Sequence, residues 1–485
     1  MYAPKHTNLF KILQSNKEWV VIILIFVTSL FLYSSSLNNY FYQDDFFNIK
    51  ISLSQGVLES FNLFGKPILE FYAYRPLTTQ LFWGLGYHFF GLNPIPFHLI
   101  LFIFYLSTLL LVYQCAKTLL NSRKIGLLSL FVYAFSASHY YRLYFLSQFQ
   151  EIGLAFLTLL LFYFYLKKHY KISLILLLAS LCSKETAVVI PLVMAFTSLY
   201  QRILFKTARY WLFGVGIVIL YILIRAHYYG FFSGGVYTYD FHLKSIINNY
   251  FWYTLWSLGV PESFSNVKVF TGGLRLNPLL WTTFGRYGPI IVSLTFALLG
   301  LITIGLIKSK NKLHNFRQFM YAISWFVVFL LPVGFFPFHK FGYSLALPLF
   351  GFSLFLAVLL GNSNRKLIFI TLSLYIILSV SSLRLNLENH WSTKLSYTAK
   401  TVIDYLSVRY MKGEKLPRIF FRSTFDPVCP INNYSSSDVS HAISNGDALS
   451  LIYPGSEQNV YFEFDDKYKN FNRAEVFIDS RRFIK

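Results

Sequence analysis

Long apolar runs separated by short polar connections make up most of the first 384 residues of the chain. A membrane-spanning helix needs about 20 mostly apolar residues, and somewhat fewer where neighbouring helices enclose it. The pattern therefore predicts eleven spanning helices with loose boundaries. They are residues 19–37, 95–116, 125–141, 145–166, 172–184, 187–204, 210–228, 287–307, 318–337, 343–361 and 367–384. The fifth run is short and joins the sixth through the polar turn 183–186.

Two longer connections interrupt these runs. Residues 38–94 contain the apolar, aromatic stretch 77–90, and residues 229–286 contain a similar stretch at 246–258. Both stretches are typical of helices that lie along a membrane interface.

From residue 385 onward the composition changes to that of a soluble domain. Apolar residues at helical spacing predict a helix over 393–410. Short apolar and β-branched runs predict strands at 418–422, 448–453, 460–464 and 475–478. The predicted fold is thus an all-α polytopic membrane domain, residues 1–384, followed by a small α/β domain, residues 385–485.

The charge of the chain depends on where the basic residues lie. There are 43 Lys and Arg against 21 Asp and Glu, a net charge of +22, yet only 13% of residues are charged. Soluble proteins carry about 25% charged residues. If the N-terminus is cytoplasmic, the inside segments hold 18 basic residues and one acid, Glu18. The positive-inside rule then predicts a plasma-membrane protein with an extracytoplasmic C-terminal domain, and argues against nucleic acid as a partner.

The strongest local signal for chemistry is the acidic pair Asp44-Asp45, directly after the first run. Adjacent carboxylates among aromatic residues resist joint ionisation, so one of them is a candidate general base. The same oxygens suit a divalent cation. A solvated acidic turn is the plain alternative.

Four further segments carry candidate site residues on the same predicted outer side. Arg75 precedes Pro76, which suits the first turn of a helix, and its guanidinium suits either a phosphate or lipid head groups. Lys184-Glu185 lies at membrane depth, where charged groups are energetically unfavourable and usually functional. The alternative to a functional role is an internal ion pair that holds two short helices together. His339, Lys340 and Tyr343 precede the tenth run, and Lys340 suits a lipid phosphate or a snorkelling role. Glu151, with Gln148, lies in an otherwise apolar run and needs a partner, such as a structural hydrogen bond.

These motifs, in this order, resemble those of GT-C superfamily glycosyltransferases over about residues 19–384. The resemblance rests on Asp44-Asp45, Tyr74-Arg75-Pro76-Leu77, Phe90-Gly91-Leu92-Asn93-Pro94 with His98, Ser183-Lys184-Glu185-Thr186 with Pro191, and Lys340-x-x-Tyr343 with Pro348. It is nearest to bacterial relatives of protein O-mannosyltransferases, especially those that carry tetratricopeptide repeats.

The resemblance implies an inverting enzyme that uses a polyprenyl-phosphate-linked sugar. Asp44 would be the base, with Asp45 supporting it. Arg75 matches a cation that contacts the donor phosphate in the related aminoarabinose-transferase branch, and Lys340 and Lys184 are further candidates. The chain departs from the pattern because it has no tetratricopeptide array and because Lys340 stands where an acidic–basic pair is usual. The acceptor class and the metal requirement stay open.

Two other functions compete with sugar transfer. A transporter or flippase for a lipid-linked substrate predicts inverted repeats and charges deep in several spans. A non-catalytic assembly factor predicts that Asp44 is dispensable. The sequence has no G-x-x-x-x-G-K-[ST] loop, which argues against nucleotide hydrolysis.

Overall fold

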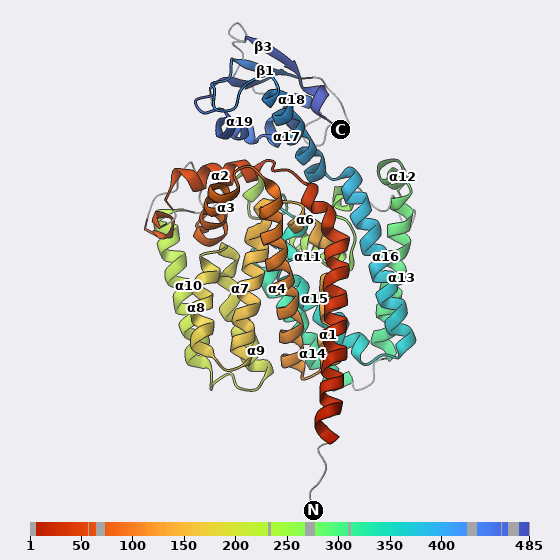
Figure 1. Ribbon diagram of the computed structural model, residues 1–485. Coiled ribbons are helices and arrows are strands. Elements are labelled where there is room, and N and C mark those ends of the chain that lie inside the picture. The colour runs from red at the N-terminus through yellow and green to blue at the C-terminus, as the bar shows by residue number, and fades with distance from the viewer. Residues whose placement is uncertain are drawn as a thin grey trace, which may run out of the picture.

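The computed structural model describes residues 6–56, 58–64, 73–230, 234–266, 277–308, 312–423, 434–456, 458–463 and 475–484. Within these residues, each of the eleven apolar runs forms a helix, and these helices align in one bundle (Figure 1). They are α1 (His6–Tyr33), α4 (Pro94–Leu120), α5 (Arg123–Ala134), α7 (Phe149–Leu166), α8 (Tyr170–Leu181), α9 (Ile190–Tyr200), α10 (Ala208–Tyr228), α13 (Tyr287–Lys308), α14 (Lys312–Leu330), α15 (Pro348–Gly361) and α16 (Arg365–Asn389).

Six segments of the described chain are long and apolar enough to cross a bilayer. They are Lys17–Asn38, Pro94–Leu120, Leu146–Leu166, Ala208–Tyr228, Tyr287–Lys308 and Arg365–Ser407. Large apolar side chains on these helices face outward, among them Phe31 at 81% exposure and Phe369 at 72%. Such surfaces suit a lipid bilayer.

The other predicted spans are helical but short. α5 has 12 residues, which is about 18 Å of helix, and α9 has 11. Their chains continue as brief 3-10 segments, such as η6 (Glu185–Val189) before α9 and η9 (Gly342–Leu345) before α15. Non-helical backbone at membrane depth is tolerated where protein encloses it or where it lines a cavity. Apolar periodicity does not detect these breaks.

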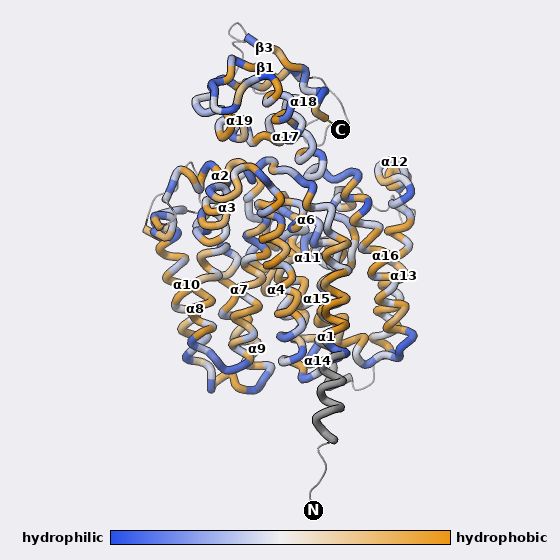
Figure 2. Tube along the Cα trace, viewed as in Figure 1, coloured by the Kyte–Doolittle hydropathy of each residue, from blue (hydrophilic) through white to orange (hydrophobic). Residues whose placement is uncertain are grey.

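The basic connections gather at one end of the bundle. The connections α4–α5, α7–α8, α9–α10 and α15–α16 lie at the end from which the N-terminus extends, and this end is hydrophilic (Figures 1 and 2). These connections carry most of the basic residues counted above. The C-terminal domain covers the opposite end (Figure 1).

The two long connections contribute further helices. They are α2 (Asp44–Ser54), the π-helix η3 (Pro76–Leu81), α3 (Phe82–Phe90), α11 (Leu243–Leu258) and α12 (Leu279–Phe284). η3 and α3 together cover the predicted interfacial stretch 77–90. α11 covers 246–258 and buries Tyr253 and Trp256 against Leu330 and Leu345.

The C-terminal domain is a small three-stranded parallel sheet with helices. It contains α17 (Trp391–Ser407), β1 (Ile419–Arg422), α18 (Ser435–Ala442), α19 (Asp447–Ile452), β2 (Val460–Phe462) and β3 (Val476–Asp479). The strand order is β2-β1-β3, and Phe420 of β1 pairs with Tyr461 and Phe477. Three of the four predicted strands are confirmed within the described residues; residue 464 lies outside them.

The predicted strand 448–453 is wrong, because these residues form α19. The buried residues are Ala448, Leu449 and Ile452, a spacing that places them on one helical face. Gly446 turns the chain with a φ of 100°, and Asp447 occupies the first turn, where an acid is favourable. A short apolar run fits the spacing of a strand as well as that of a helix. Here the turn at Gly446 leads into a helix.

Close packing of α14 against α15 depends on Gly351. A Cβ atom at this position would lie 2.6 Å from the Ala322 carbonyl oxygen and 2.8 Å from the Phe326 backbone nitrogen. We expect Gly351→Ala to destabilise the protein by about 1–3 kcal/mol, measured as a lower midpoint of thermal unfolding in detergent. Gly300→Ala is the control, because no atom lies within 4 Å of its Cβ position. Equal midpoints for the two variants would contradict this packing.

Candidate active site

Seven of the ten predicted site residues line one cavity of about 750 Å³. These are Asp44, Arg75, Gln148, Lys184, Glu185, His339 and Tyr343. They come from α2, the segment before η3, the 3-10 helix η5 (Leu146–Gln148), the start of η6 and the segment between α14 and α15. The cavity therefore joins residues up to 299 positions apart in the chain.

The two acids of the pair have different surroundings. Asp44 begins α2, its side chain opens into the cavity, and it accepts no hydrogen bond from the described residues. Asp45 is fully buried and does not line the cavity. Its Oδ1 accepts hydrogen bonds from the backbone N–H of Ser147 at 2.7 Å and from the Ser147 hydroxyl, and its Oδ2 accepts the Tyr42 N–H at 3.1 Å. Asp45 thus fixes the start of α2 on the loop before α7.

The surrounding protein, which displaces water, raises the pKa of both carboxyl groups. The pKa of Asp45 rises to about 8, although the hydrogen bonds from Ser147 and Tyr42 act in the opposite direction. The pKa of Asp44 is also raised, because protein surrounds the cavity, while the positive charges of Arg75 and His441 oppose the shift. Mutual repulsion of the acids, the cause inferred from their adjacency, is the smallest contribution to the pKa of Asp45.

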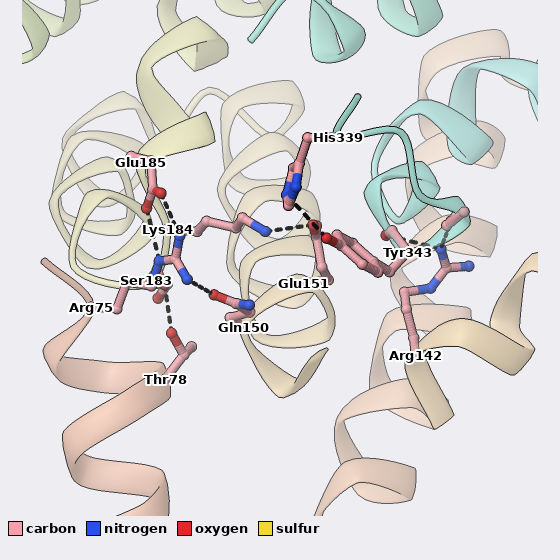
Figure 3. Close-up of polar contacts among 11 residues, drawn as sticks. Arg75, Thr78, Arg142, Gln150, Glu151, Ser183, Lys184, Glu185, His339 and Tyr343 are labelled. Atoms are coloured by element: carbon pink, nitrogen blue, oxygen red, sulfur yellow. Dashed lines mark hydrogen bonds and ion pairs between the residues drawn. The ribbon is translucent and has the colours of Figure 1, made fainter. Parts of the chain in front are cut away.

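Arg75 forms an ion pair with Glu185 across the cavity wall. Its Nε donates to Glu185 Oε2 at 2.8 Å, its Nη2 donates to Glu185 Oε1, and its Nη1 donates to Gln150 Oε1 (Figure 3). A guanidinium has five N–H groups, so two remain for a ligand. The two-oxygen contact fixes the plane of the guanidinium.

Backbone contacts explain why Arg75 and Glu185 meet. The Leu77 N–H donates to the Cys182 carbonyl oxygen at 3.1 Å, and the Thr78 hydroxyl donates to the carbonyl oxygen of Ser183 (Figure 3). Pro76 starts η3 at the first position, where a proline costs no hydrogen bond. η3 is thereby attached to the turn that precedes Glu185.

Lys184 forms a second, more deeply buried ion pair. Its Nζ lies 2.6 Å from Glu151 Oε1, and the two side chains are 9% and 7% exposed. Nζ is also 5.7 Å from the centre of the Tyr343 ring, a cation–π contact. Glu151 needs a partner inside its apolar run, and that partner is Lys184. Glu151 itself does not line the main cavity.

The segment after α14 supplies the opposite wall. The Tyr343 hydroxyl lies 3.2 Å from His339 Nε2 (Figure 3). Burial, with the charges of Lys184 and Arg75, lowers the pKa of His339 to about 4, so this imidazole is neutral at neutral pH. Lys340 is half-buried and does not line the cavity.

Buried polar groups hold this segment in place. The Arg142 guanidinium donates to the carbonyl oxygens of Gly342 and Tyr343, both at 3.2 Å. The Gly342 N–H donates to Glu262 Oε2 at 2.5 Å. A Cβ atom at Gly342 would lie 2.4 Å from the Tyr141 ring, so only glycine fits.

Several cavity residues were missed by the sequence analysis. Arg225 of α10 and Gln150 of α7 are polar residues within apolar runs. The same signal identified Glu151 as a candidate site residue. Tyr221 and Tyr237 carry no signal of their own in the sequence. The Tyr221 hydroxyl and Gln148 Oε1 have no hydrogen-bond partner among the described residues.

One side of the cavity is apolar or aromatic. It includes Val188, Val189, Ile222, Tyr239, Phe241, Leu331, Pro332, Val333, Phe335 and Phe336. Ile222 is 37% exposed and Phe241 is 71% exposed, so this wall continues to the surface of the molecule. The cavity thus combines a charged end with an apolar side.

Asp44 and Asp45 do not present a shared pair of carboxylates to a cation, since both oxygens of Asp45 accept hydrogen bonds from protein. The described residues contain no group of three or more His, Cys, Asp or Glu side chains that fits a metal ion. Of the predicted pair, Asp44 alone faces the cavity.

No protein-family model matches the chain, and no curated protein matches it.

Proposed function

We propose that the protein transfers a sugar from a polyprenyl phosphate to an extracytoplasmic acceptor, which is a protein hydroxyl, a lipid or a surface glycan. One observation carries the proposal: a single cavity combines the carboxylate of Asp44 with the cations Arg75, Lys184 and Arg225. A group-transfer reaction of this kind needs a base for the acceptor and cations for an anionic leaving group.

The donor groups left at Arg75 and Lys184 suit a phosphate. Arg75 uses three of its five N–H groups on Glu185 and Gln150, and Lys184 uses one of three on Glu151. The carboxylates hold both cations in place before the donor arrives. A lipid phosphate then accepts the remaining hydrogen bonds without rearrangement of the wall.

The apolar wall suits the isoprenoid chain of the donor. Its members lie on α10, at the end of η6, in residues 239–241 and in residues 331–336, and they lead from the charged end to the outer surface. A chain entering from the bilayer would stay in apolar surroundings along this route. This favours a lipid-linked donor over a soluble sugar nucleotide.

The reaction follows from these positions. The acceptor hydroxyl oxygen attacks the anomeric carbon of the donor sugar, and its proton passes to the Asp44 carboxylate. The bond between the anomeric carbon and the phosphate oxygen breaks, and its electron pair stays on the phosphate, which Arg75 and Lys184 stabilise. The products are the glycosylated acceptor, with inverted configuration, and polyprenyl phosphate.

The positive-inside rule gives the side of the membrane. The basic connections lie at the end of the bundle opposite the C-terminal domain, and such loops are typically cytoplasmic. We therefore infer that the cavity and the C-terminal domain are extracytoplasmic, at the plasma membrane.

The transfer reaction itself can be tested with purified protein in lipid nanodiscs, a panel of polyprenyl phosphates carrying labelled sugars, and cell-envelope acceptors. We expect labelled acceptor and one released polyprenyl phosphate for each sugar transferred. Movement of intact donor across vesicles without its cleavage would instead identify a flippase. Neither transfer nor cleavage with any donor would contradict the proposal.

Arg75 should determine the affinity for the donor. We expect Arg75→Ala to raise the KM for the donor about 10- to 100-fold, because a hydrogen bond to a charged group contributes about 1.5–3 kcal/mol. Arg75→Lys should recover little, since a lysine cannot bind both Glu185 oxygens and a phosphate. Arg286→Ala, at an exposed arginine outside the cavity, is the control. An unchanged KM in Arg75→Ala would show that Arg75 serves only to hold Glu185.

A further inference from the structure

A second cavity, separate from the candidate active site, lies where the C-terminal domain meets the bundle. It is a groove of about 700 Å³, and none of its lining residues lines the first cavity. Its walls come from residues 38–40 at the end of the 3-10 helix η1 (Ser34–Asn38), from the end of α16, and from one face of α17. Ligand sites of this size occur preferentially at the interfaces between domains.

The sequence of α17 explains why the face towards the groove is polar. The buried apolar residues of α17 recur at intervals of three and four positions, which places them on one side of the helix. They are Leu395, Ala399, Val402 and Leu406. The residues that line the groove have the same spacing on the opposite side, and they include Thr393, Tyr397, Lys400 and Asp404. The helix rises about 16 Å from Thr393 to Asp404, so the groove has a long polar wall.

Hydrogen bonds between protein groups fix the floor of the groove. The Ser396 hydroxyl accepts the Tyr40 N–H at 2.8 Å and donates to the Tyr40 carbonyl oxygen at 3.1 Å. Asn39 Nδ2 donates to the carbonyl oxygen of Tyr144 at 2.9 Å. These contacts join α17 to the bundle, so the groove has its shape before a ligand binds, which lowers the entropic cost of binding.

The polar groups at the rim of the groove remain open to a ligand. Four lining side chains form no hydrogen bond or ion pair with any described residue. They are Asn38, Lys394, Lys400 and Asp404. A fifth, Glu388, accepts one hydrogen bond, from the Tyr287 hydroxyl at 2.9 Å.

The charges of the rim balance, which indicates the class of ligand. Two ammonium groups, of Lys394 and Lys400, face the carboxylates of Glu388 and Asp404, so neither an anion such as phosphate nor a cation is favoured overall. A hydroxyl group both donates and accepts hydrogen bonds, so a ligand rich in hydroxyl groups can bind ammonium, carboxylate and amide groups together.

Aromatic rings add an apolar surface to the groove. Tyr40 and Tyr397 both line it, and Tyr397 is 46% exposed. A tyrosine ring offers a flat apolar face beside its polar hydroxyl. A sugar ring has the complementary character, with hydroxyl groups at its edge and C–H groups on its faces.

We propose that this groove binds an uncharged oligosaccharide. Its wall of about 16 Å is longer than a single sugar ring, and therefore suits a chain of several sugars. The groove and the first cavity are joined by one segment, since Tyr40 lines the groove and Asp44 lines the cavity. Four residues of chain span at most about 14 Å. That the oligosaccharide is the acceptor rests on the proposed function, but its binding to the groove does not.

Binding can be measured without any glycosyl donor. Short oligosaccharides are released from the envelope of the cells that make the protein, labelled with a fluorophore, and separated by anion exchange into uncharged and anionic fractions. Fluorescence anisotropy then follows their binding to the intact protein in nanodiscs. We expect an uncharged fraction to bind, and Asp404→Asn and Tyr397→Ala each to raise its Kd at least about tenfold.

Glu414→Gln and Tyr434→Ala are the matched controls, because both residues are exposed in the C-terminal domain and lie outside the groove. They should leave the Kd unchanged, and thermal unfolding of each variant checks that the fold is retained. No binding of an uncharged fraction, tighter binding of the anionic fraction, or equal Kd values in the wild type, Asp404→Asn and Tyr397→Ala would overturn the inference. Binding of the uncharged fraction by a protein that transfers no sugar would support the groove as a site and count against the proposed function.

Discussion

Replacement of Asp44 by asparagine is expected to slow sugar transfer by about two to four orders of magnitude. The asparagine side chain keeps the size of Asp44 but cannot accept the proton of the acceptor hydroxyl. Because no described residue donates a hydrogen bond to the Asp44 carboxylate, the substitution should leave the fold and the donor KM nearly unchanged. The measurement is kcat for transfer, together with the midpoint of thermal unfolding.

The same residue predicts the pH dependence of transfer. The base must be ionised, so activity is present above the pKa of Asp44 and is lost as the pH falls through it. The surrounding protein raises this pKa above the ordinary aspartate value. We therefore expect the acid limb of kcat/KM to lie at a higher pH than an exposed aspartate would give.

Asp45→Asn is the matched control for Asp44→Asn. Its amide would turn an N–H toward the backbone N–H of Tyr42 and lose one of three hydrogen bonds, at a cost of about 1–3 kcal/mol in stability. Transfer should fall much less than in Asp44→Asn. Wild-type kcat in Asp44→Asn, or equal losses of kcat in the two variants, would remove Asp44 from the role of base.

Breaking the Lys184–Glu151 pair is expected to have the largest effect on stability. Removal of one partner from a buried ion pair leaves an uncompensated charge and costs about 3–5 kcal/mol. Glu151→Gln should therefore lower the midpoint of thermal unfolding strongly. Asp479→Asn, which breaks the exposed pair between Asp479 and Arg481, should change stability by less than about 1 kcal/mol.

The double variant Lys184→Met/Glu151→Leu distinguishes the contribution of this pair to stability from its contribution to sugar transfer. Removing both charges and replacing them with apolar groups is often neutral for stability, so most of the lost stability should return. Transfer should stay low, because a cation for the donor phosphate is gone. Wild-type transfer by the double variant would show that Lys184 only stabilises the packing of the helices.

Apolar periodicity was sufficient to locate the helices but not their interruptions. Each predicted run is helical, because about 20 apolar residues in series have few other options at membrane depth. The breaks beside α5, α9 and α15 arise from hydrogen bonds to residues remote in sequence, such as those of Arg142 to the carbonyl oxygens of Gly342 and Tyr343. No local pattern contains that information.

The site was predictable as a set of residues on one side, but its pairings were not. Asp44, Arg75 and Lys184 were selected as charges at one end of the runs, and they line one cavity. That Asp45 points away from this cavity follows from helix geometry, which turns successive side chains by about 100°. The partner of Arg75 is Glu185 because η3 is attached to the Cys182–Ser183 turn, a tertiary contact.

The C-terminal domain is the part whose role was least predictable. Its composition indicated a soluble α/β unit, and nothing in it resembled a site. Its docking depends on tertiary contacts such as the hydrogen bond from the Gln43 N–H to the Ala442 carbonyl oxygen, which joins α18 to the residue before α2. No local pattern in either segment predicts that contact.

The central claim is that the cavity between Asp44, Arg75 and Lys184 binds a polyprenyl-phosphate sugar with its chain along the apolar wall. A donor with a photoreactive group in its isoprenoid chain tests this most directly, with crosslinked peptides identified by mass spectrometry. We expect crosslinks to α10 and to residues 331–336, prevented by excess polyprenyl phosphate but not by uncharged polyprenol, and strongly reduced in Arg75→Ala. Crosslinks confined to the outer faces of α1 or α13, or unaffected by Arg75→Ala, would contradict the account.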